Sequence, residues 1–351
     1  MRPASPEPSR VLPYCRSALA SQRLSNFGPL VAQLEERLAD LLKVDRNSVT
    51  TVANATLGLQ GILANVDAPS SAVIGVQSWT FPAPVSVAVA SPYDVVLCDV
   101  SLDTWRVKVD EGADIQIDVL PFGDGLALGP SSWRTFTVVD AAASLPTLIQ
   151  EGIPSSPGPF ALVCSLHTTK AISGAEGGIV YSNDTQLIKN IRRWSNFGFD
   201  SNRSAQRLGT NAKMSEMDAA VALAALDEWS LTEEKLLKQT RRALRTSTKI
   251  GVGVAPSLTK ERVTPYWVLK LANSKEVKLL ERLAEKALIE TRHWWASGCH
   301  VMPPFSHLAK HELGSTEELA RTTIALPFWR DLSDAEWTRL ENLLEDFKSA
   351  K

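Results

Sequence analysis

The residues with the clearest potential for chemistry surround Lys170. In "FALVCSLHTTKAISGAEGGIVYS" (160–182) an apolar run ends in hydroxyl and imidazole side chains, the lysine follows, and a glycine-rich turn leads into a second apolar run. A lysine amine attacks a carbonyl carbon only when it is unprotonated, and burial or a nearby cation favours that state. Its small and hydroxylated neighbours favour a lysine that bonds covalently to a bound molecule. The alternative is an ordinary solvated lysine at the surface.

A second candidate is Asp140 in "VVDAAASL" (138–145), at the end of a buried strand. Functional residues gather at the carboxyl ends of parallel strands. Three alanines beside this carboxylate leave space for a flat ring. The carboxylate could keep a pyridine nitrogen protonated, so that the ring accepts electrons. The alternative is an aspartate that caps a helix or turn.

Two further stretches could bind the phosphate and the ring of a phosphorylated aromatic molecule. "NATLGL" (54–59) begins a helix, so the N–H groups of Ala55 and Thr56 and the threonine hydroxyl suit a phosphate. The alternative is ordinary capping by Asn54 or Thr56. "SWTFPAP" (78–84) offers Trp79 and Phe81, either of which could cover a ring face, with core packing as the alternative.

Candidate substrate contacts lie in "IETRHWWASGCHVMPPF" (289–305). Arg292 could bind a carboxylate or a diphosphate, with His293 and His300 nearby in the sequence. The alternative is a strand with packed tryptophans and a surface arginine. We expect His167 to form part of the wall of the site and not to carry protons.

The apolar pattern indicates elements that could position these residues. Continuous apolar runs suit strands that are covered on both faces, and so a mostly parallel sheet in an α/β domain. We expect 1–235 to form this large domain and 236–351 a smaller α+β domain. The predicted strands are 71–76, 94–100, 135–141, 161–166, 178–182 and 265–272; the predicted helices are 28–43, one from about 55, 215–229, 231–249, 275–289 and one that begins with a Ser333–Glu336 capping box.

Bulk properties restrict the class of protein. The 351 residues carry a formal charge of −2, which gives no indication of nucleic acid or an anionic membrane as a partner. The four cysteines are far apart with no CxxC pair, which argues against a disulfide framework or a zinc site. The N-terminus lacks the apolar core of a signal peptide, and no apolar run approaches ~18 residues. We therefore expect a cytoplasmic protein.

In their order along the chain, these features match a fold-type I pyridoxal phosphate (PLP) enzyme. The chain resembles the DegT/StrS-type sugar aminotransferases over about residues 24–345. The stretches that carry the resemblance are "NFGPLVAQLEERLADLL", "NATLGLQGIL", "SWTFPAPVSVAV", "VVDAAASL", "SLHTTKAISGAEGGIVYSND", "RRWSNFGFD", "GTNAKMSEMDAAVALAALDEW" and "TTIALPFW".

The resemblance implies a role for each of these residues. Lys170 would bind the cofactor covalently and Asp140 would pair with its ring nitrogen. Phe81 would stack on the ring, a role that the alignment favours over one for Trp79. The phosphate would be held by Ala55, Thr56 and Ser165, and by Asn211 of the neighbouring subunit, which implies a homodimer with shared active sites.

The implied reaction moves an amino group from an amino acid, L-glutamate by the resemblance, to C-4 of a keto sugar on a nucleoside diphosphate, for polysaccharide, O-antigen or glycoside synthesis. Transfer to C-3 is the nearest alternative. A catalytically silent PLP-binding regulator and a structural protein of the same fold, which would bind no PLP, are alternatives outside catalysis.

Some positions depart from the family pattern. Ala143 replaces a common glutamine beside the ring, Ala55 replaces a glycine and Lys213 replaces an arginine, which removes any bidentate contact there. Family members that act as dehydratases have histidine in place of the lysine, so Lys170 favours transamination. Residues 101–135 match the family least, and sugar specificity could reside there.

Overall fold

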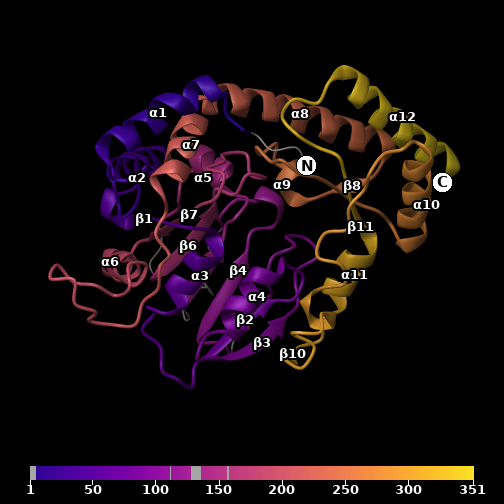
Figure 1. Ribbon diagram of the computed structural model, residues 1–351. Helices are drawn as coiled ribbons and strands as arrows, with labels where there is room; N and C mark the ends of the chain where they lie inside the picture. The colour runs from indigo at the N-terminus through magenta and orange to yellow at the C-terminus, as the bar shows by residue number, and fades with distance from the viewer. Residues whose placement is uncertain (1–4, 111, 128–135, 156–157) are drawn as a thin grey trace.

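The computed structural model describes residues 5–110, 112–127, 136–155 and 158–351. A large unit is built around one sheet, and a smaller unit, from the C-terminal part of the chain, is built around a second (Figure 1). Helix α8 (Trp229–Ile250) runs between them. The expected boundary between residues 235 and 236 falls inside this helix, and the division into domains at that point stays a prediction.

The large sheet has the order β1-β7-β6-β5-β4-β2-β3-β10. From β6 to β10 all neighbouring strands are parallel, and β7 is antiparallel to both of its neighbours. This confirms the expected mostly parallel sheet of an α/β fold. The strands are β1 (Val49–Val52), β2 (Val73–Gln77), β3 (Asp94–Cys98), β4 (Ile115–Val119), β5 (Phe136–Asp140), β6 (Phe160–Ser165), β7 (Gly178–Ser182) and β10 (Ala309–Lys310).

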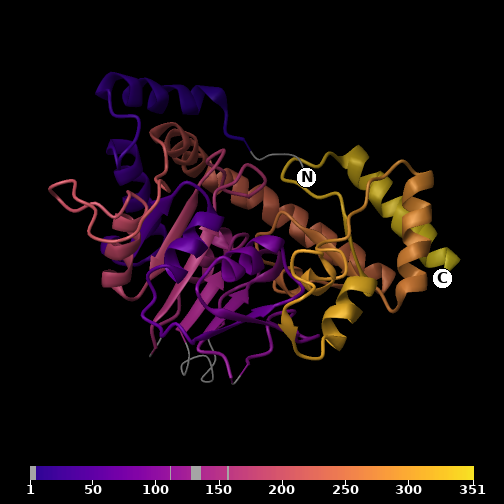
Figure 2. The ribbon, with the colours of Figure 1, turned by 60° about the horizontal axis from the view of Figure 1, so that its bottom comes forward.

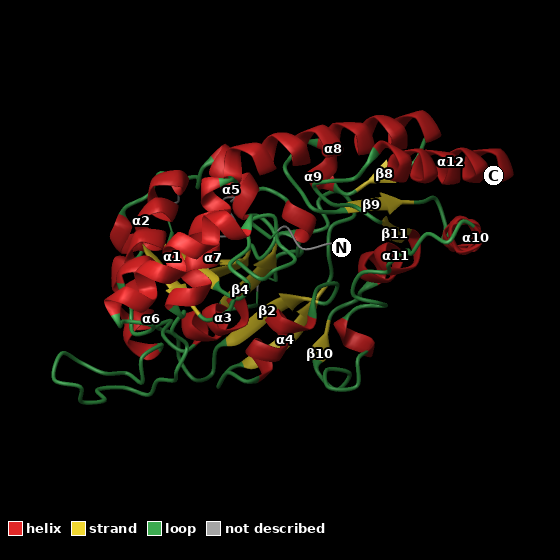
Figure 3. Cartoon of the chain, turned by 45° about the horizontal axis from the view of Figure 1, so that its top comes forward, coloured by secondary structure: helices red, strands yellow, loops and turns green. Residues whose placement is uncertain are grey.

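Helices cover both faces of the large sheet (Figure 3). Side chains alternate along β6, so that Leu162 belongs to the core on one face and Val163 to the core on the other. Both faces are buried, which explains why the strands have continuous apolar sequences. The covering helices are α2 (Pro29–Leu42), α3 (Ala55–Leu63), α4 (Pro82–Val89), α5 (Leu145–Glu151), α6 (Thr185–Trp194) and α7 (Glu216–Asp227).

The small sheet has the antiparallel order β11-β9-β8 and packs against helices. Trp267 and Trp337 lie in its core with ring centroids 5.3 Å apart. The expected capping box is present, because the Ser333 hydroxyl accepts the Glu336 N–H and the Glu336 carboxylate accepts the Ser333 N–H. The elements are β8 (Gly253–Val254), α9 (Pro256–Thr259), β9 (Trp267–Lys270), α10 (Ser274–Lys286), α11 (Gly314–Thr322), β11 (Thr323–Leu326) and α12 (Asp334–Ala350).

Several elements of the structure were not among the expected ones, and α1 and β4 show why. Helix α1 (Pro8–Ser21) lies beside α7, where the Tyr14 hydroxyl donates to Asp227 at 2.9 Å (Figure 2). This helix was not expected because its sequence contains prolines and many polar residues. Strand β4 was missed because Gln116 and Asp118 interrupt its apolar pattern; in the structure both are buried, and Gln116 donates to the Gly75 carbonyl at 2.7 Å. Among the described residues, no helix is long and apolar enough to cross a membrane.

Candidate active site

Lys170 lies in the tight loop that joins β6 to β7. The backbone hydrogen bonds that hold this loop include those from Thr168 N–H to the Ala175 carbonyl at 2.9 Å and from Lys170 N–H to the His167 carbonyl at 2.8 Å. The lysine side chain leaves this loop half-buried, and its Nζ lies 3.2 Å from the hydroxyl of Tyr266. The amine is thus held between the large sheet and the small unit.

Asp140 ends β5, the strand next to β6, and is only 6% exposed. Burial raises the pKa of its carboxyl, while the Ala142 N–H, which donates to it at 3.0 Å, and the charge of Lys170 act in the opposite direction. Among the described residues, Ala142 is the one hydrogen-bond donor found for this carboxylate. A positively charged ring nitrogen would therefore stabilise its ionised form.

The first turn of α3 lies close to the ends of β6 and β7. Asn54 caps this helix with its side chain, which is the capping role that the sequence left open. In the part of the chain that the structure describes, no acceptor is found for the N–H groups of Ala55 and Thr56. Ser165 lies opposite Gly178 in the register of β6 and β7, and a Cβ on Gly178 would lie 2.8 Å from the Ala55 nitrogen. Glycine at this position lets the strand approach the helix start.

Trp79 and Phe81 have different surroundings. Trp79 is fully buried, with ring centroids 4.8 Å from Trp295 and 5.5 Å from Trp105, so it packs inside an aromatic cluster. Phe81 immediately precedes α4 and is 59% exposed, so its ring is free to cover a bound group. Ala143, where the family often has glutamine, packs against the same cluster as Trp79.

Asn211 is exposed on the long loop between α6 and α7. Its backbone pairs with Asn196, and the next residue, Ala212, accepts the N–H of Ala53 at 2.8 Å, close to the start of α3. The Asn211 side chain accepts a hydrogen bond from Lys213 at 2.7 Å.

The three candidate histidines are not brought together. His167 pairs with Thr169 at 2.9 Å on the loop that carries Lys170. His293 is exposed and pairs with Glu281 of α10 at 2.7 Å. His300 is buried, and its Nδ1 lies 2.8 Å from the Ser78 hydroxyl.

His300 joins the C-terminal part of the chain to the segment after β2. Its backbone N–H also donates to the Ser78 hydroxyl at 3.1 Å. Burial, and then the charge of Lys310, lower the pKa of its imidazole. These contacts give His300 a packing role next to Trp79.

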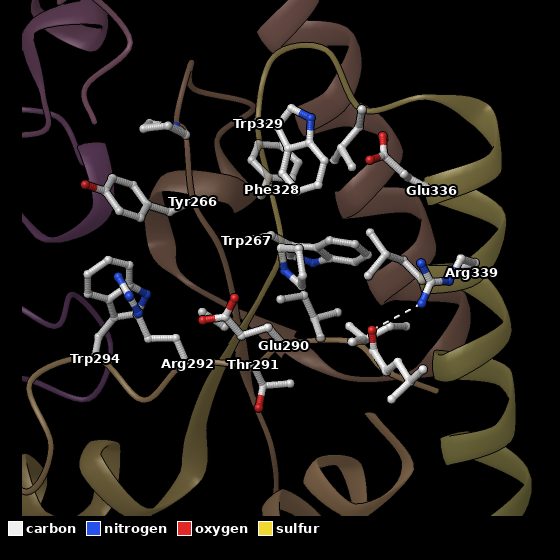
Figure 4. A pocket seen from close by; sticks show the side chains of 18 residues that line it. Tyr266, Trp267, Glu290, Thr291, Arg292, Trp294, Phe328, Trp329, Glu336 and Arg339 are labelled. Carbon is white, nitrogen blue, oxygen red and sulfur yellow. Dashed lines mark hydrogen bonds between the residues drawn. The ribbon is translucent and has the colours of Figure 1, made fainter. Parts of the chain in front are cut away.

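Arg292 lines a cavity of about 370 Å³ in the small unit (Figure 4). Its guanidinium carbon lies 5.0 Å from the Trp294 ring centroid, and its backbone pairs with Ala325 of β11. Tyr266 and Trp294 line the same cavity, with centroids 5.4 Å apart. Because Tyr266 also contacts Lys170, this cavity is next to the candidate site.

Tyr266 is the residue of the site that sequence interpretation missed. It lies two positions after Thr264, whose hydroxyl accepts the Tyr266 N–H at 3.2 Å and donates to the Phe122 carbonyl. The tyrosine ring is 7% exposed and contacts Phe122 edge-on, with centroids 5.6 Å apart. Its only signal in the sequence is its place at the start of the expected strand 265–272, which is a poor indication of chemistry.

Comparison with known proteins identifies the family. A sequence model of the DegT/DnrJ/EryC1/StrS aminotransferase family matches residues 8–115 and 131–345. The chain belongs to this family. This confirms the resemblance and the expected fold, and the expected class, PLP-dependent sugar aminotransferase, is that of the family.

The relatives of this member of the DegT/DnrJ/EryC1/StrS family differ in the share of each sequence that the match covers. A Mycobacterium tuberculosis protein, Rv3402c, is 26% identical over 70% of this chain but only 64% of its own length, so this chain spans less than two thirds of that relative. The dTDP-4-amino-4,6-dideoxy-D-glucose transaminase of Shigella dysenteriae is 24% identical over 95% of this chain and 94% of its own. The structure of DesI with its TDP-sugar product is 28% identical, has a TM-score of 0.82, and covers 99% of this chain and 92% of its own.

The family uses PLP, and the residues present fit that cofactor. The buried Asp140 carboxylate suits a protonated pyridine nitrogen, and the N–H groups of Ala55 and Thr56 suit a phosphate. The charge of the Lys170 amine lowers the pKa of the Asp140 carboxyl and so favours its ionised form.

Proposed function

We propose that this chain transfers an amino group from an amino acid, L-glutamate, to the C-4 keto group of a deoxysugar linked to a nucleoside diphosphate. The observation that carries the proposal is the Lys170 amine, which lies 3.2 Å from the Tyr266 hydroxyl and whose charge lowers the pKa of the buried Asp140 carboxyl. Because the cofactor would hold the amine between two separate half-reactions, we expect ping-pong kinetics.

Each side chain has a defined task in this reaction. When bound, PLP supplies an aldehyde that takes up the amine and a ring that stores an electron pair. Lys170 Nζ would accept a proton from the α-carbon of the amino donor and pass it to the cofactor carbon that holds the amine. In the second half-reaction it would take that proton back and donate it to the sugar carbon. Asp140 holds a proton on the ring nitrogen. Tyr266 orients the amine of Lys170 while that amine is free.

The position on the sugar rests on the relatives. The Shigella dysenteriae protein, whose name places the amine at C-4, matches 95% of this chain. A Streptomyces venezuelae protein named dTDP-3-amino-3,4,6-trideoxy-alpha-D-glucose transaminase is 26% identical over 49% of this chain, which keeps C-3 as the alternative. Incubation with 4-keto and 3-keto nucleotide sugars, followed by NMR of the product, separates the two positions.

A homodimer with shared active sites and a cytoplasmic location belong to the same proposal. The loop that carries Asn211 also exposes apolar side chains, with Leu208 95% and Phe197 45% accessible. A second copy of the chain would bury these side chains and bring Asn211 to its phosphate site. Light scattering on the purified protein measures the oligomeric state.

Replacing the lysine tests the proposal. We expect Lys170→Ala to lose turnover and the visible absorbance that PLP gains when it is bound to a lysine. Lys238→Ala, at an exposed position of α8, is the matched control and should keep both. Borohydride reduction followed by peptide mapping should place a pyridoxyl mass on the Lys170 peptide. PLP binding without amine transfer for any keto sugar would favour the regulatory alternative.

A further inference from the structure

Three side chains with metal-binding atoms meet at the edge of the large sheet, outside the candidate active site. Cys98 ends β3, Asp110 lies on the loop before β4, and His311 follows β10. Their Sγ, carboxylate oxygen and imidazole nitrogen all lie within 4.8 Å of one another. The His311 Nε2 is 3.0 Å from the Asp110 Oδ2.

The strand pairing places two of these residues side by side. β10 is parallel to β3, with Ala309 opposite Val96 and Lys310 opposite Leu97, and the two strands adjoin in Figure 1. His311 continues this register next to Cys98, and its N–H donates to the Leu97 carbonyl at 3.0 Å. The positions of Cys98 and His311 are therefore fixed by the backbone of the sheet.

Asp110 is oriented by its own set of contacts. Its backbone N–H donates to the Gln116 side chain at 3.2 Å, and its Oδ1 accepts the Gly112 N–H at 2.9 Å, which leaves Oδ2 toward His311. The Asp110 side chain is 13% exposed and that of His311 is 54% exposed, while Cys98 is buried at 1%. Two ligands are thus held inside and one lies at the surface, where an ion could enter.

We propose that Cys98, Asp110 and His311 bind a divalent transition-metal ion, with zinc as the best fit. Thiolate, imidazole and carboxylate together suit zinc, whereas calcium and magnesium prefer oxygen ligands alone. Around a tetrahedral zinc ion such ligand atoms lie about 3.4–3.6 Å apart, so only small side-chain movements are needed. The fourth position takes a water molecule, and binding releases the thiol proton of Cys98.

The consequence of this site is structural. A bound ion would link the segment around β10 to β3, because His311 follows β10 and Cys98 is the last residue of β3. Spacing along the chain gives no sign of it, because the three ligands come from separate segments and no CxxC pair is present.

The test uses the full chain, freed of metal by a chelator and titrated with Co²⁺ as a spectroscopic probe. We expect one equivalent per chain, a thiolate-to-cobalt charge-transfer band, and displacement by Zn²⁺. Cys98→Ser should lose the band, and Asp110→Asn and His311→Ala should weaken binding at least about tenfold. Zn²⁺ should raise the melting temperature of the parent protein but not of His311→Ala.

Matched controls are His307→Ala, an exposed histidine on the same segment, and Cys15→Ser; both should bind like the parent. If Cys98→Ser fails to fold, His311→Ala decides, because that side chain lies at the surface. The proposal is overturned if no thiolate band forms, if the band persists in Cys98→Ser, or if His311→Ala binds as tightly as His307→Ala.

Discussion

Replacing Tyr266 by phenylalanine isolates the contact between the small unit and Lys170. The hydroxyl lies 3.2 Å from Nζ, and the ring packs against Phe122 and Trp294 with centroids 5.6 and 5.4 Å away. Tyr266→Phe keeps this packing and removes one hydrogen bond. A hydrogen bond of this kind contributes about 0.5–1.5 kcal/mol, which corresponds to a change of about 2- to 13-fold in rate.

The expected effect falls on proton transfer and not on substrate binding. We expect kcat of the half-reaction with the amino donor to decrease by that factor, with KM unchanged. Single-turnover absorbance measurements with glutamate give the rate directly. Tyr93→Phe, on the loop before β3, is the matched control. If Tyr266→Phe reacts as fast as the parent protein, the hydroxyl has no part in positioning the Lys170 amine.

Three further predictions concern assembly and stability. Mixing Lys170→Ala with Asn211→Ala, each inactive alone, should restore about a quarter of the parental activity after subunit exchange, because half of the dimers are hybrid and each hybrid has one intact site; no recovery would exclude shared sites. Asp99 is buried, which opposes its ionisation, but Lys108 at 2.7 Å and backbone N–H groups lower its pKa to about 2. Because the folded value lies below the unfolded value of 3.8, this stabilisation is complete above about pH 4 and is lost as the pH falls through 2. Asp99→Asn should therefore lower the unfolding free energy by roughly 1–3 kcal/mol at pH 7, with a difference from the parent that closes in acid; a difference that does not change with pH would contradict this account. Gly58→Ala places a Cβ 2.9 Å from a methyl of β6, so overpacking of about 1–3 kcal/mol should exceed the helix-propensity gain of about 1 kcal/mol and lower the denaturation midpoint. An unchanged or raised midpoint would show that the neighbouring side chains move to accommodate the added methyl group.

Local patterns were sufficient for most of the core elements. The continuous apolar runs of β5 and β6 indicated a sheet that is buried on both faces, and the structure confirms it. Ser333 with Glu336 indicated the start of α12, because a capping box is a contact between residues three positions apart. Expected strand 94–100 ends earlier in the structure, at Cys98, and residue 135 of expected strand 135–141 lies outside the described residues.

The parts that were missed depend on long-range contacts. Gln116 and Asp118 are polar, so the sequence alone does not predict a buried strand. In the structure Gln116 donates to the Gly75 carbonyl and Asp118 pairs with Arg106, and these contacts allow both side chains to be buried. Tyr266 gains its position at the candidate site only when β9 is brought against the loop of Lys170. Of residues 101–135, where we expected sugar specificity to reside, 111 and 128–135 lie outside the described residues.

The short strand β10 has a consequence for synthesis of the chain on the ribosome. It covers the outer edge of β3, yet Lys310 emerges about 210 residues after Cys98. At about 5–20 residues per second this interval lasts on the order of 10–40 s. Throughout it the nascent sheet presents unpaired N–H and carbonyl groups along β3, the kind of edge to which another nascent chain can add. Truncations that stop before residue 309 should therefore aggregate through this edge.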